Sequence, residues 1–145
     1  MITLERTVHV ERPIERVFGF LIDFTNAEQW DPGTVSCTLL RGDGGVGTQY
    51  RNVSKFLGRS TELVYEVTQV DVPRLFVIVG RNDTVTSTDT ITVTPHGTGT
   101  RVTYRAVFDF QGWARLGEPL LNVAIKRLGD RAEETLQTSL MQLPA

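Results

Sequence analysis

The sequence contains few of the residues that form disulfides and metal sites. Its 145 residues include one cysteine, Cys37, and two histidines, His9 and His96. A single cysteine cannot form an internal disulfide, and so small a supply of soft ligands argues against a structural zinc site. We therefore expect neither a metal nor a cofactor.

Long apolar runs and clusters of basic residues are also missing. The longest apolar run covers five residues, 75–79, whereas a membrane-spanning helix needs about 20. Fifteen Lys and Arg residues stand against 17 Asp and Glu residues, with no basic run that could neutralise a row of phosphates. Residues 1–6 carry two charges where a secretion signal requires an apolar stretch. We expect a cytoplasmic protein that binds no nucleic acid and does not insert into a membrane.

The chain is rich in β-branched residues, with 42 Thr, Val and Ile side chains, which favour strands. Apolar and polar residues alternate in most of the segments between short turns. Loops this short join antiparallel neighbours. The predicted strands cover residues 2–10, 35–41, 48–57, 61–70, 74–79, 84–94 and 101–110.

Helical spacing of apolar residues occurs in residues 13–22, in a short turn at 27–30 and in residues 119–143. The pattern indicates a single α+β domain over residues 1–145, in which the last helix is long enough to cross the sheet. A strongly twisted antiparallel sheet curls, so one straight helix cannot fill its concave side at both ends. We therefore expect an internal cavity, with residues 111–117 as its rim or lid.

Two sequence motifs resemble those of a known superfamily. The first is Val8–Phe18 followed by Leu21, Asp23, Asn26, Trp30 and Pro32, and the second is Gly97–Tyr104. They resemble the START-like, or SRPBCC, superfamily, which includes polyketide cyclase/dehydrase, lipid-transfer and plant pathogenesis-related proteins. The resemblance implies a helix-grip fold: a seven-stranded curved antiparallel sheet around a long C-terminal helix, with two short helices after strand 1. Arg12 departs from the small residue usual before the proline, which affects packing more than chemistry.

Two apparent site motifs have simpler explanations. Gly42–Gly47 matches the spacing of a dinucleotide-binding loop, but a strand follows it where that site needs a helix N-terminus, so we predict a flexible hairpin. His9 lies opposite the apolar face of its strand and His96 lies in a turn. Neither these residues nor Cys37 shows the pattern of a nucleophile with its base.

Strand 84–94 predicts a buried carboxylate. Val85, Ile91 and Val93 form its apolar face, and strict alternation turns Ser87 and Asp89 to the same side. A buried Asp89 must then meet a donor, a cation, water or a ligand, or keep its proton with a raised pKa. Both a purely structural pairing and a functional role fit this pattern.

The same alternation predicts the wall of the cavity. Tyr65, Tyr104 and Phe108 lie on apolar faces, and we assign the Tyr50 face of residues 48–57 to the interior. Such a wall suits a small-molecule pocket, although a filled core would show the same pattern. The predicted ligand-binding residues are Tyr50, Asn52, Tyr65, Ser87, Asp89, Tyr104, Phe108, Leu121 and Ile125.

Residues 75–79 are apolar on both faces. If Leu75, Val77 and Val79 lie inside, Phe76 and Ile78 lie outside, where they could form the contact of a homodimer.

Three functions fit the sequence. The first is binding of a hydrophobic or aromatic small molecule, lipid-like or polyketide-like, in the cavity. The second, implied by the resemblance, is a polyketide cyclase or dehydratase in which Asp89 is the general base and Tyr65 or Tyr104 stabilises the enolate. The third is a protein-interaction module like a chaperone regulator, which would use the outer sheet face and need no cavity. No catalytic motif of a subfamily matches, so no catalytic residue is assigned from the resemblance.

Overall fold

The computed structural model describes all residues from Met1 to Ala145. Its strands form one antiparallel sheet of seven in the order β1-β7-β6-β5-β4-β3-β2. The strands are β1 (Ile2–Val10), β2 (Thr34–Arg41), β3 (Gln49–Phe56), β4 (Arg59–Asp71), β5 (Leu75–Arg81), β6 (Val85–His96) and β7 (Gly99–Phe110). The helices are α1 (Ile14–Ile22), η1 (Phe24–Asn26), α2 (Ala27–Trp30), η2 (Gly112–Gly117) and α3 (Glu118–Met141).

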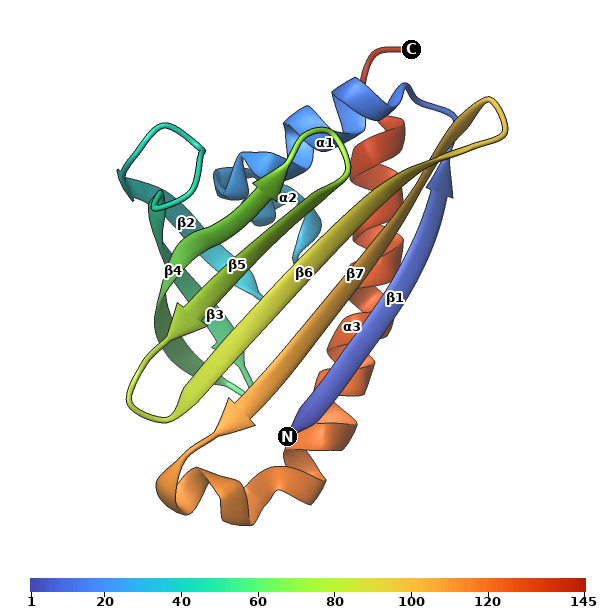
Figure 1. The fold of residues 1–145 in the computed structure, drawn as a ribbon. Coiled ribbons are helices and arrows are strands. Elements are labelled where there is room, and N and C mark those ends of the chain that lie inside the picture. The colour runs from blue at the N-terminus through green and yellow to red at the C-terminus, as the bar shows by residue number, and fades with distance from the viewer.

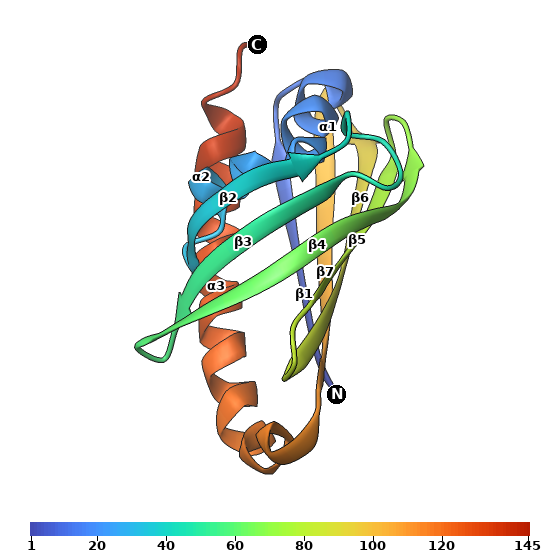
Figure 2. The ribbon, with the colours of Figure 1, turned by 90° about the vertical axis from the view of Figure 1, so that its left-hand side faces the viewer.

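The sheet curls around α3, which runs the length of its concave side (Figures 1 and 2). The short helices α1 and α2 lie at the end of the molecule that carries the C-terminus, drawn at the top in Figure 1. At the opposite end, η2 turns the chain from β7 into α3. The expected seven strands, two short helices and long terminal helix are thus confirmed, and residues 112–117 form a 3-10 helix rather than a loose loop.

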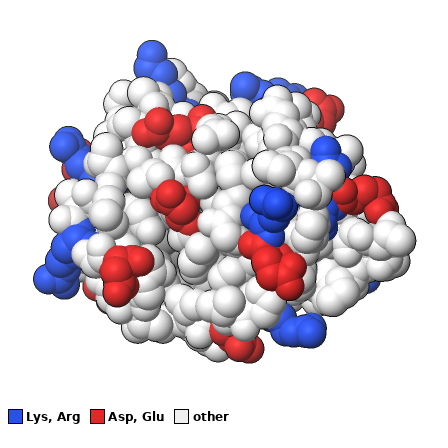
Figure 3. Space-filling view, turned by 90° about the horizontal axis from the view of Figure 1, so that it is seen from above, with Lys and Arg blue, Asp and Glu red and all other residues white.

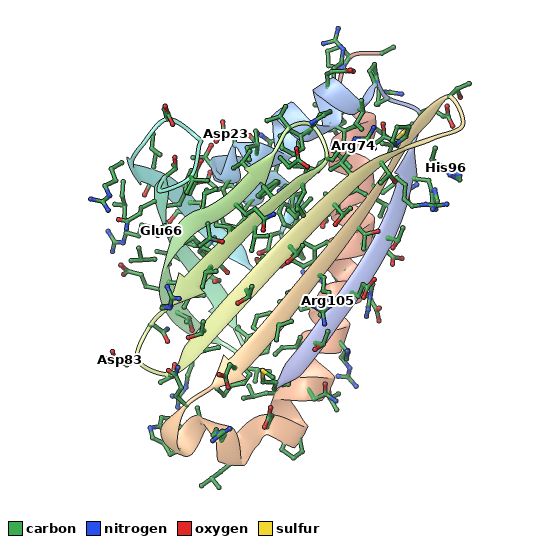
Figure 4. All side chains as sticks on the ribbon, viewed as in Figure 1. Asp23, Glu66, Arg74, Asp83, His96 and Arg105 are labelled. Atoms are coloured by element: carbon green, nitrogen blue, oxygen red, sulfur yellow. The ribbon has the colours of Figure 1, made fainter.

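Alternation along the strands sets the inner face of the sheet. On β6, every second residue from Val85 to Val93 is buried, while the intervening threonines are half-buried on the convex face. Outward-pointing residues on the convex face include Glu66 and Arg105 (Figure 4). The inward orientation of Tyr50, Asn52, Tyr65, Ser87 and Asp89 follows the predicted pattern, and all five are buried.

The predicted orientation of β5 is wrong. Phe76 and Ile78 are fully buried, because Phe76 pairs with the inward-pointing Ile91 and Ile78 pairs with the inward-pointing Asp89. Leu75 and Val77 point to the convex face and are half-buried there. Phe76 and Ile78, which suggested the contact of a homodimer, are therefore part of the core. They do not support dimerisation.

The long helix is fastened to β1 along its length. Gly129 faces Leu4 so closely that a Cβ atom on Gly129 would lie 2.3 Å from Leu4 Cδ1. The Arg6 guanidinium donates to Asp130 Oδ1 at 2.8 Å and to the Lys126 carbonyl at 3.2 Å. These contacts fix the distance between α3 and the sheet edge.

The core fills one end of the molecule much more than the other. A cluster of 21 buried residues joins α1, α2, the inner sheet face and the C-terminal part of α3. A second cluster contains only four buried residues, Ile2, Leu4, Ala106 and Ile125. The end near η2 is therefore where open space can remain.

The surface at the end that carries the C-terminus shows no strong accumulation of charge of one sign (Figure 3). Seen from the end that carries the C-terminus, acidic and basic side chains are interspersed (Figure 3). None of the helices has both the length and the apolar character needed to cross a membrane. The structure contains no group of three or more His, Cys, Asp or Glu side chains arranged to hold a metal ion.

Candidate functional site: a cavity between the sheet and the long helix

A cavity of about 1050 Å³ lies between the concave face of the sheet and the N-terminal half of α3. Hydrophobic residues make up 18 of the 31 that line it. Leu4, Tyr65, Tyr104 and Phe108 line it from the sheet, and Leu121, Ile125 and Leu128 are among those that line it from α3. The expected internal space is therefore present.

The mouth of the cavity is built from three separate segments. They are the β3–β4 hairpin, which reaches towards the lower half of α3 in Figure 2, the turn between β5 and β6, and η2 with the start of α3. Figure 4 shows Asp83 in the β5–β6 turn at this end of the molecule, and His96 at the other. Exposed apolar side chains at the mouth are Leu57, Trp113, Leu116 and Leu120.

One cluster of polar side chains lies at the wall around Tyr104. The Tyr104 hydroxyl donates to Asp89 Oδ2 at 3.0 Å. The Ser87 hydroxyl donates to Asp89 Oδ1 at 2.7 Å. Both carboxylate oxygens of Asp89 therefore have a hydroxyl donor, and Tyr104 connects the carboxylate to the cavity.

Burial controls the acid–base character of this cluster. It raises the pKa of Asp89 to about 7, although the hydrogen bonds from Ser87 and Tyr104 act in the opposite direction. Burial also raises the pKa values of Tyr65 and Tyr104 well above their usual value, and the nearby Asp89 charge adds to both shifts. The tyrosines therefore act as neutral hydrogen-bonding groups.

A second polar group lies where α2 meets β2. Asp31 accepts hydrogen bonds from the Gly33 amide at 3.0 Å and the Thr34 hydroxyl at 2.9 Å. Burial raises the pKa of Asp31 against the effect of these two bonds. The Asn52 amide donates to Thr34 Oγ1 at 3.1 Å. Asp31 and Asn52 both line the cavity.

Trp30 places a buried donor without a partner on this wall. Its side chain is only 2% exposed and its ring packs edge-on against Tyr104, with centroids 5.4 Å apart. The indole Nε1–H has no hydrogen-bond partner. Such a group is costly to bury.

The predicted ligand-binding residues fall into two groups. Six of them line the cavity: Asn52, Tyr65, Tyr104, Phe108, Leu121 and Ile125. Three do not: Ser87 and Asp89 are linked to the wall through Tyr104, and Tyr50 packs against Phe24 with ring centroids 5.8 Å apart. Alternation specifies which face a residue lies on, but it does not specify whether a neighbouring side chain covers that residue.

Sequence reasoning missed Trp30, Asp31 and Trp113 as lining residues. Trp30 belongs to the motif that carried the family resemblance, and Asp31 lies between the Trp30 and Pro32 of that motif, so the signal from Trp30 was present but was used only for the fold. Trp113 lies in the segment predicted as a rim, where its exposed aromatic ring was the available signal.

The two rejected motifs remain outside the site. Gly42–Gly47 forms a turn that leads directly into β3, as predicted for a hairpin. His9 and His96 are exposed and contact each other, with ring centroids 4.5 Å apart. Burial raises the pKa of the Cys37 thiol to about 11, so little thiolate forms at neutral pH.

Comparison with known proteins agrees with this architecture. A family model described as polyketide cyclase/dehydrase and lipid transport matches residues 1–140. The chain is 17% identical to a START superfamily protein from Mycobacterium smegmatis, with a TM-score of 0.80 and 97% of each chain covered. It is 14% identical to the Zhui aromatase/cyclase from Streptomyces sp. R1128, with a TM-score of 0.80 over 95% of this chain and 92% of that one. No curated protein matches the sequence.

Proposed function

The chain belongs to the polyketide cyclase/dehydrase and lipid-transport family, and on this premise we propose that it binds an apolar or aromatic small molecule, lipid-like or polyketide-like. The resemblance to START/SRPBCC proteins inferred from the two motifs is confirmed. The observation that carries the proposal is the cavity of about 1050 Å³ with its mainly apolar wall. A module that acted only through its outer face would need no such space.

Burial of apolar surface supplies the affinity. At about 25 cal/mol per Å², hiding roughly 250 Å² of ligand surface contributes about 6 kcal/mol before ordering costs. Polar side chains on the wall, Tyr104 and Asn52 among them, orient the ligand's polar substituents. Exposed Leu57, Trp113 and Leu116 offer an apolar path at the mouth.

Thermal unfolding with an added aromatic probe tests this function. 2-Naphthol should raise the Tm of the protein in a concentration-dependent way, because a ligand that binds only the folded state stabilises it. Leu121→Lys should weaken binding at least tenfold by placing a charge in the cavity wall. Val123→Lys is the matched control on the same helix, since Val123 is half exposed and does not line the cavity. Unchanged Tm with the probe, or equal binding by both variants, would contradict the proposal.

A second function, a cyclase or dehydratase, is favoured by one observation. Asp89, with its pKa raised to about 7, accepts a hydrogen bond from Tyr104 on the cavity wall. Because Asp89 itself does not line the cavity, a substrate proton would pass to Tyr104 Oη while the Tyr104 proton passes to Asp89. This replaces the direct proton abstraction by Asp89 expected from the sequence.

Turnover of a poly-β-keto thioester distinguishes the two functions. An enzyme should lose at least a hundredfold in kcat on Asp89→Asn while it still binds the substrate. Equal turnover by wild-type protein and the Asp89→Asn variant would eliminate this role, and absence of turnover with intact binding would leave the binding function alone.

A further inference from the structure

The Tyr104 hydroxyl is fixed in one direction by its partner. A phenol has a single proton, and Tyr104 directs it to Asp89 Oδ2 at 3.0 Å. A carboxylate without its proton can only accept, so the bond cannot reverse while Asp89 is ionised. The lone pairs of Tyr104 Oη remain unused on a side chain that lines the cavity.

No cation competes for Asp89. Its cross-strand neighbours are Ile78 on β5 and Ala106 on β7, and its two hydrogen-bond donors are the hydroxyls of Ser87 and Tyr104. The other titratable groups that influence this cluster are Asp31, before β2, and Tyr65 on β4. Neither group can supply a positive charge that would draw Asp89 away from Tyr104.

Trp30 provides an independent observation on the same wall. Its indole Nε1–H is buried without an acceptor, and its ring contacts the ring of Tyr104. An unsatisfied buried donor costs roughly 1–3 kcal/mol. An oxygen atom of a bound ligand that reached Nε1 would remove this cost.

We propose that this wall selects a ligand that carries a hydroxyl group, an alcohol or a phenol. Its proton is accepted by Tyr104 Oη, and its oxygen accepts from Trp30 Nε1–H. Tyr104 thus acts as a specificity-determining acceptor, positioned by Asp89. This inference rests on the proposed binding function and names the chemistry of its ligand.

A pair of matched probes tests the inference at pH 8. 2-Naphthol and 2-methylnaphthalene have nearly the same shape, but only the first has a hydroxyl. Wild-type protein should bind 2-naphthol more tightly than 2-methylnaphthalene. The Kd of 2-methylnaphthalene divided by the Kd of 2-naphthol should fall about tenfold in Tyr104→Phe. Tyr50→Phe is the matched control, because Tyr50 is a buried tyrosine that does not line the cavity and packs against Phe24 instead. That variant should keep the preference.

The wild-type protein offers a second measurement if Tyr104→Phe does not fold. In a ¹H–¹⁵N correlation spectrum, the Trp30 indole proton should move further downfield with 2-naphthol than with 2-methylnaphthalene. The exposed Trp113 is the other tryptophan and serves as the internal reference. If Tyr104→Phe folds, the ratio of the two Kd values is the test. If it does not fold, the shift of the Trp30 indole proton is the test.

The outcomes separate the two proposals. If neither probe binds wild-type protein, the binding function fails and this inference fails with it. If both probes bind and the ratio of their Kd values is the same in Tyr104→Phe as in wild type, only the hydroxyl selection is overturned. If that variant does not fold, an equal response of the Trp30 proton to both probes has the same consequence.

Discussion

At the scale of single residues, Asp89 is a carboxyl group buried on the inner face of the sheet. It is 2% exposed, and two neutral hydroxyls are its only donors. Two such bonds do not replace the hydration of a carboxylate, which is why its pKa rises to about 7. A fold that keeps such a residue on a mainly apolar strand face loses stability whenever the residue ionises.

Asp89→Asn should therefore stabilise the protein at high pH. Between about pH 4 and pH 7 the folded state keeps a proton that the unfolded state has lost, so the stability of wild-type protein falls as pH rises through this window and then levels off. Asn does not titrate. The free energy of unfolding of Asp89→Asn, relative to wild type, should increase by roughly 2–3 kcal/mol between pH 5 and pH 8.

Urea unfolding at the two pH values measures this change. Asp83→Asn is the control, since Asp83 is exposed in the β5–β6 turn, and its effect should be the same at both pH values. A wild-type stability that rises from pH 5 to pH 8 relative to Asp89→Asn would show that the carboxylate is not held in a desolvating environment.

Asp89 and Phe76 show what single residues reveal in the sequence. Polar and apolar residues alternate on β6, so its inner face could be assigned and the burial of Asp89 followed. On β5 both faces are apolar, so the alternation of residues did not indicate which face points inward, and the predicted orientation of Phe76 was wrong. Only the pairing of Ile78 with Asp89 fixes it. Whether Tyr104 covers Asp89 depends on packing between strands, which no single strand encodes.

At the scale of elements, the position of α3 depends on a missing side chain. A Cβ on Gly129 would lie 2.3 Å from Leu4 Cδ1 on β1. Glycine in a helix costs about 1 kcal/mol relative to alanine, so close packing against β1 is what offsets that cost. The same approach sets the width of the cavity, because Leu4 and Gly129 both line it.

Two glycine substitutions in helices should have opposite effects. Gly129→Ala should destabilise the protein by roughly 1–3 kcal/mol because Leu4 must move. Gly19→Ala in α1 should stabilise it by about 0.5–1 kcal/mol, because no atom lies within 4 Å of the added methyl group. Leu4→Ala should cost less in the Gly129→Ala background than in wild type. Chemical denaturation checks all four variants, and a stabilised Gly129→Ala would disprove the close contact.

The end of α3 is held by a residue of the opening motif. Arg12 Nε donates to the Leu143 carbonyl at 2.7 Å, and Arg12 Nη2 donates to the Met141 carbonyl at 2.5 Å. The guanidinium thereby satisfies carbonyls at a helix C-terminus, where positive charge is favourable. This is how the unusual Arg before Pro13 acts on packing.

Arg12→Ala should destabilise the protein by roughly 1–3 kcal/mol, because two charge-assisted hydrogen bonds are lost. Arg16→Ala is the control, since Arg16 is exposed on α1 and its side chain makes no hydrogen bond, and it should change stability by less than about 0.5 kcal/mol. The midpoint of urea unfolding measures both variants. Equal effects would mean that the cap does not hold α3.

Element bounds were predictable to within a few residues, since they depend on local pattern. The terminal helix was expected at 119–143 and spans Glu118–Met141. The 3-10 geometry of η2 was not predictable, because residues 112–117 lack a repeating apolar pattern. Gly112 there has a positive φ of 62°, a backbone feature that depends on how the chain turns from β7 into α3.

At the scale of the whole molecule, the two ends differ in packing. The 21-residue cluster fills the end with α1 and α2, whereas the other end holds the cavity and only four clustered core residues. A curled sheet around a straight helix explains this division. Opening motions are expected where buried apolar contacts are few, which places them at η2 and the β3–β4 hairpin (Figure 2).

Amide hydrogen exchange should reveal this division and its response to a ligand. Without ligand, amides of η2 and of residues 56–60 should exchange at least tenfold faster than those of β6 near Ile91, which lies in the packed core. Saturating 2-naphthol should slow exchange at the mouth more than at the α1 end, because the mouth encloses the cavity that the probe occupies. The α1 amides are the internal control. Slowing at the α1 end without extra slowing at the mouth would place the binding site elsewhere, and the cavity end would then lose its assigned role.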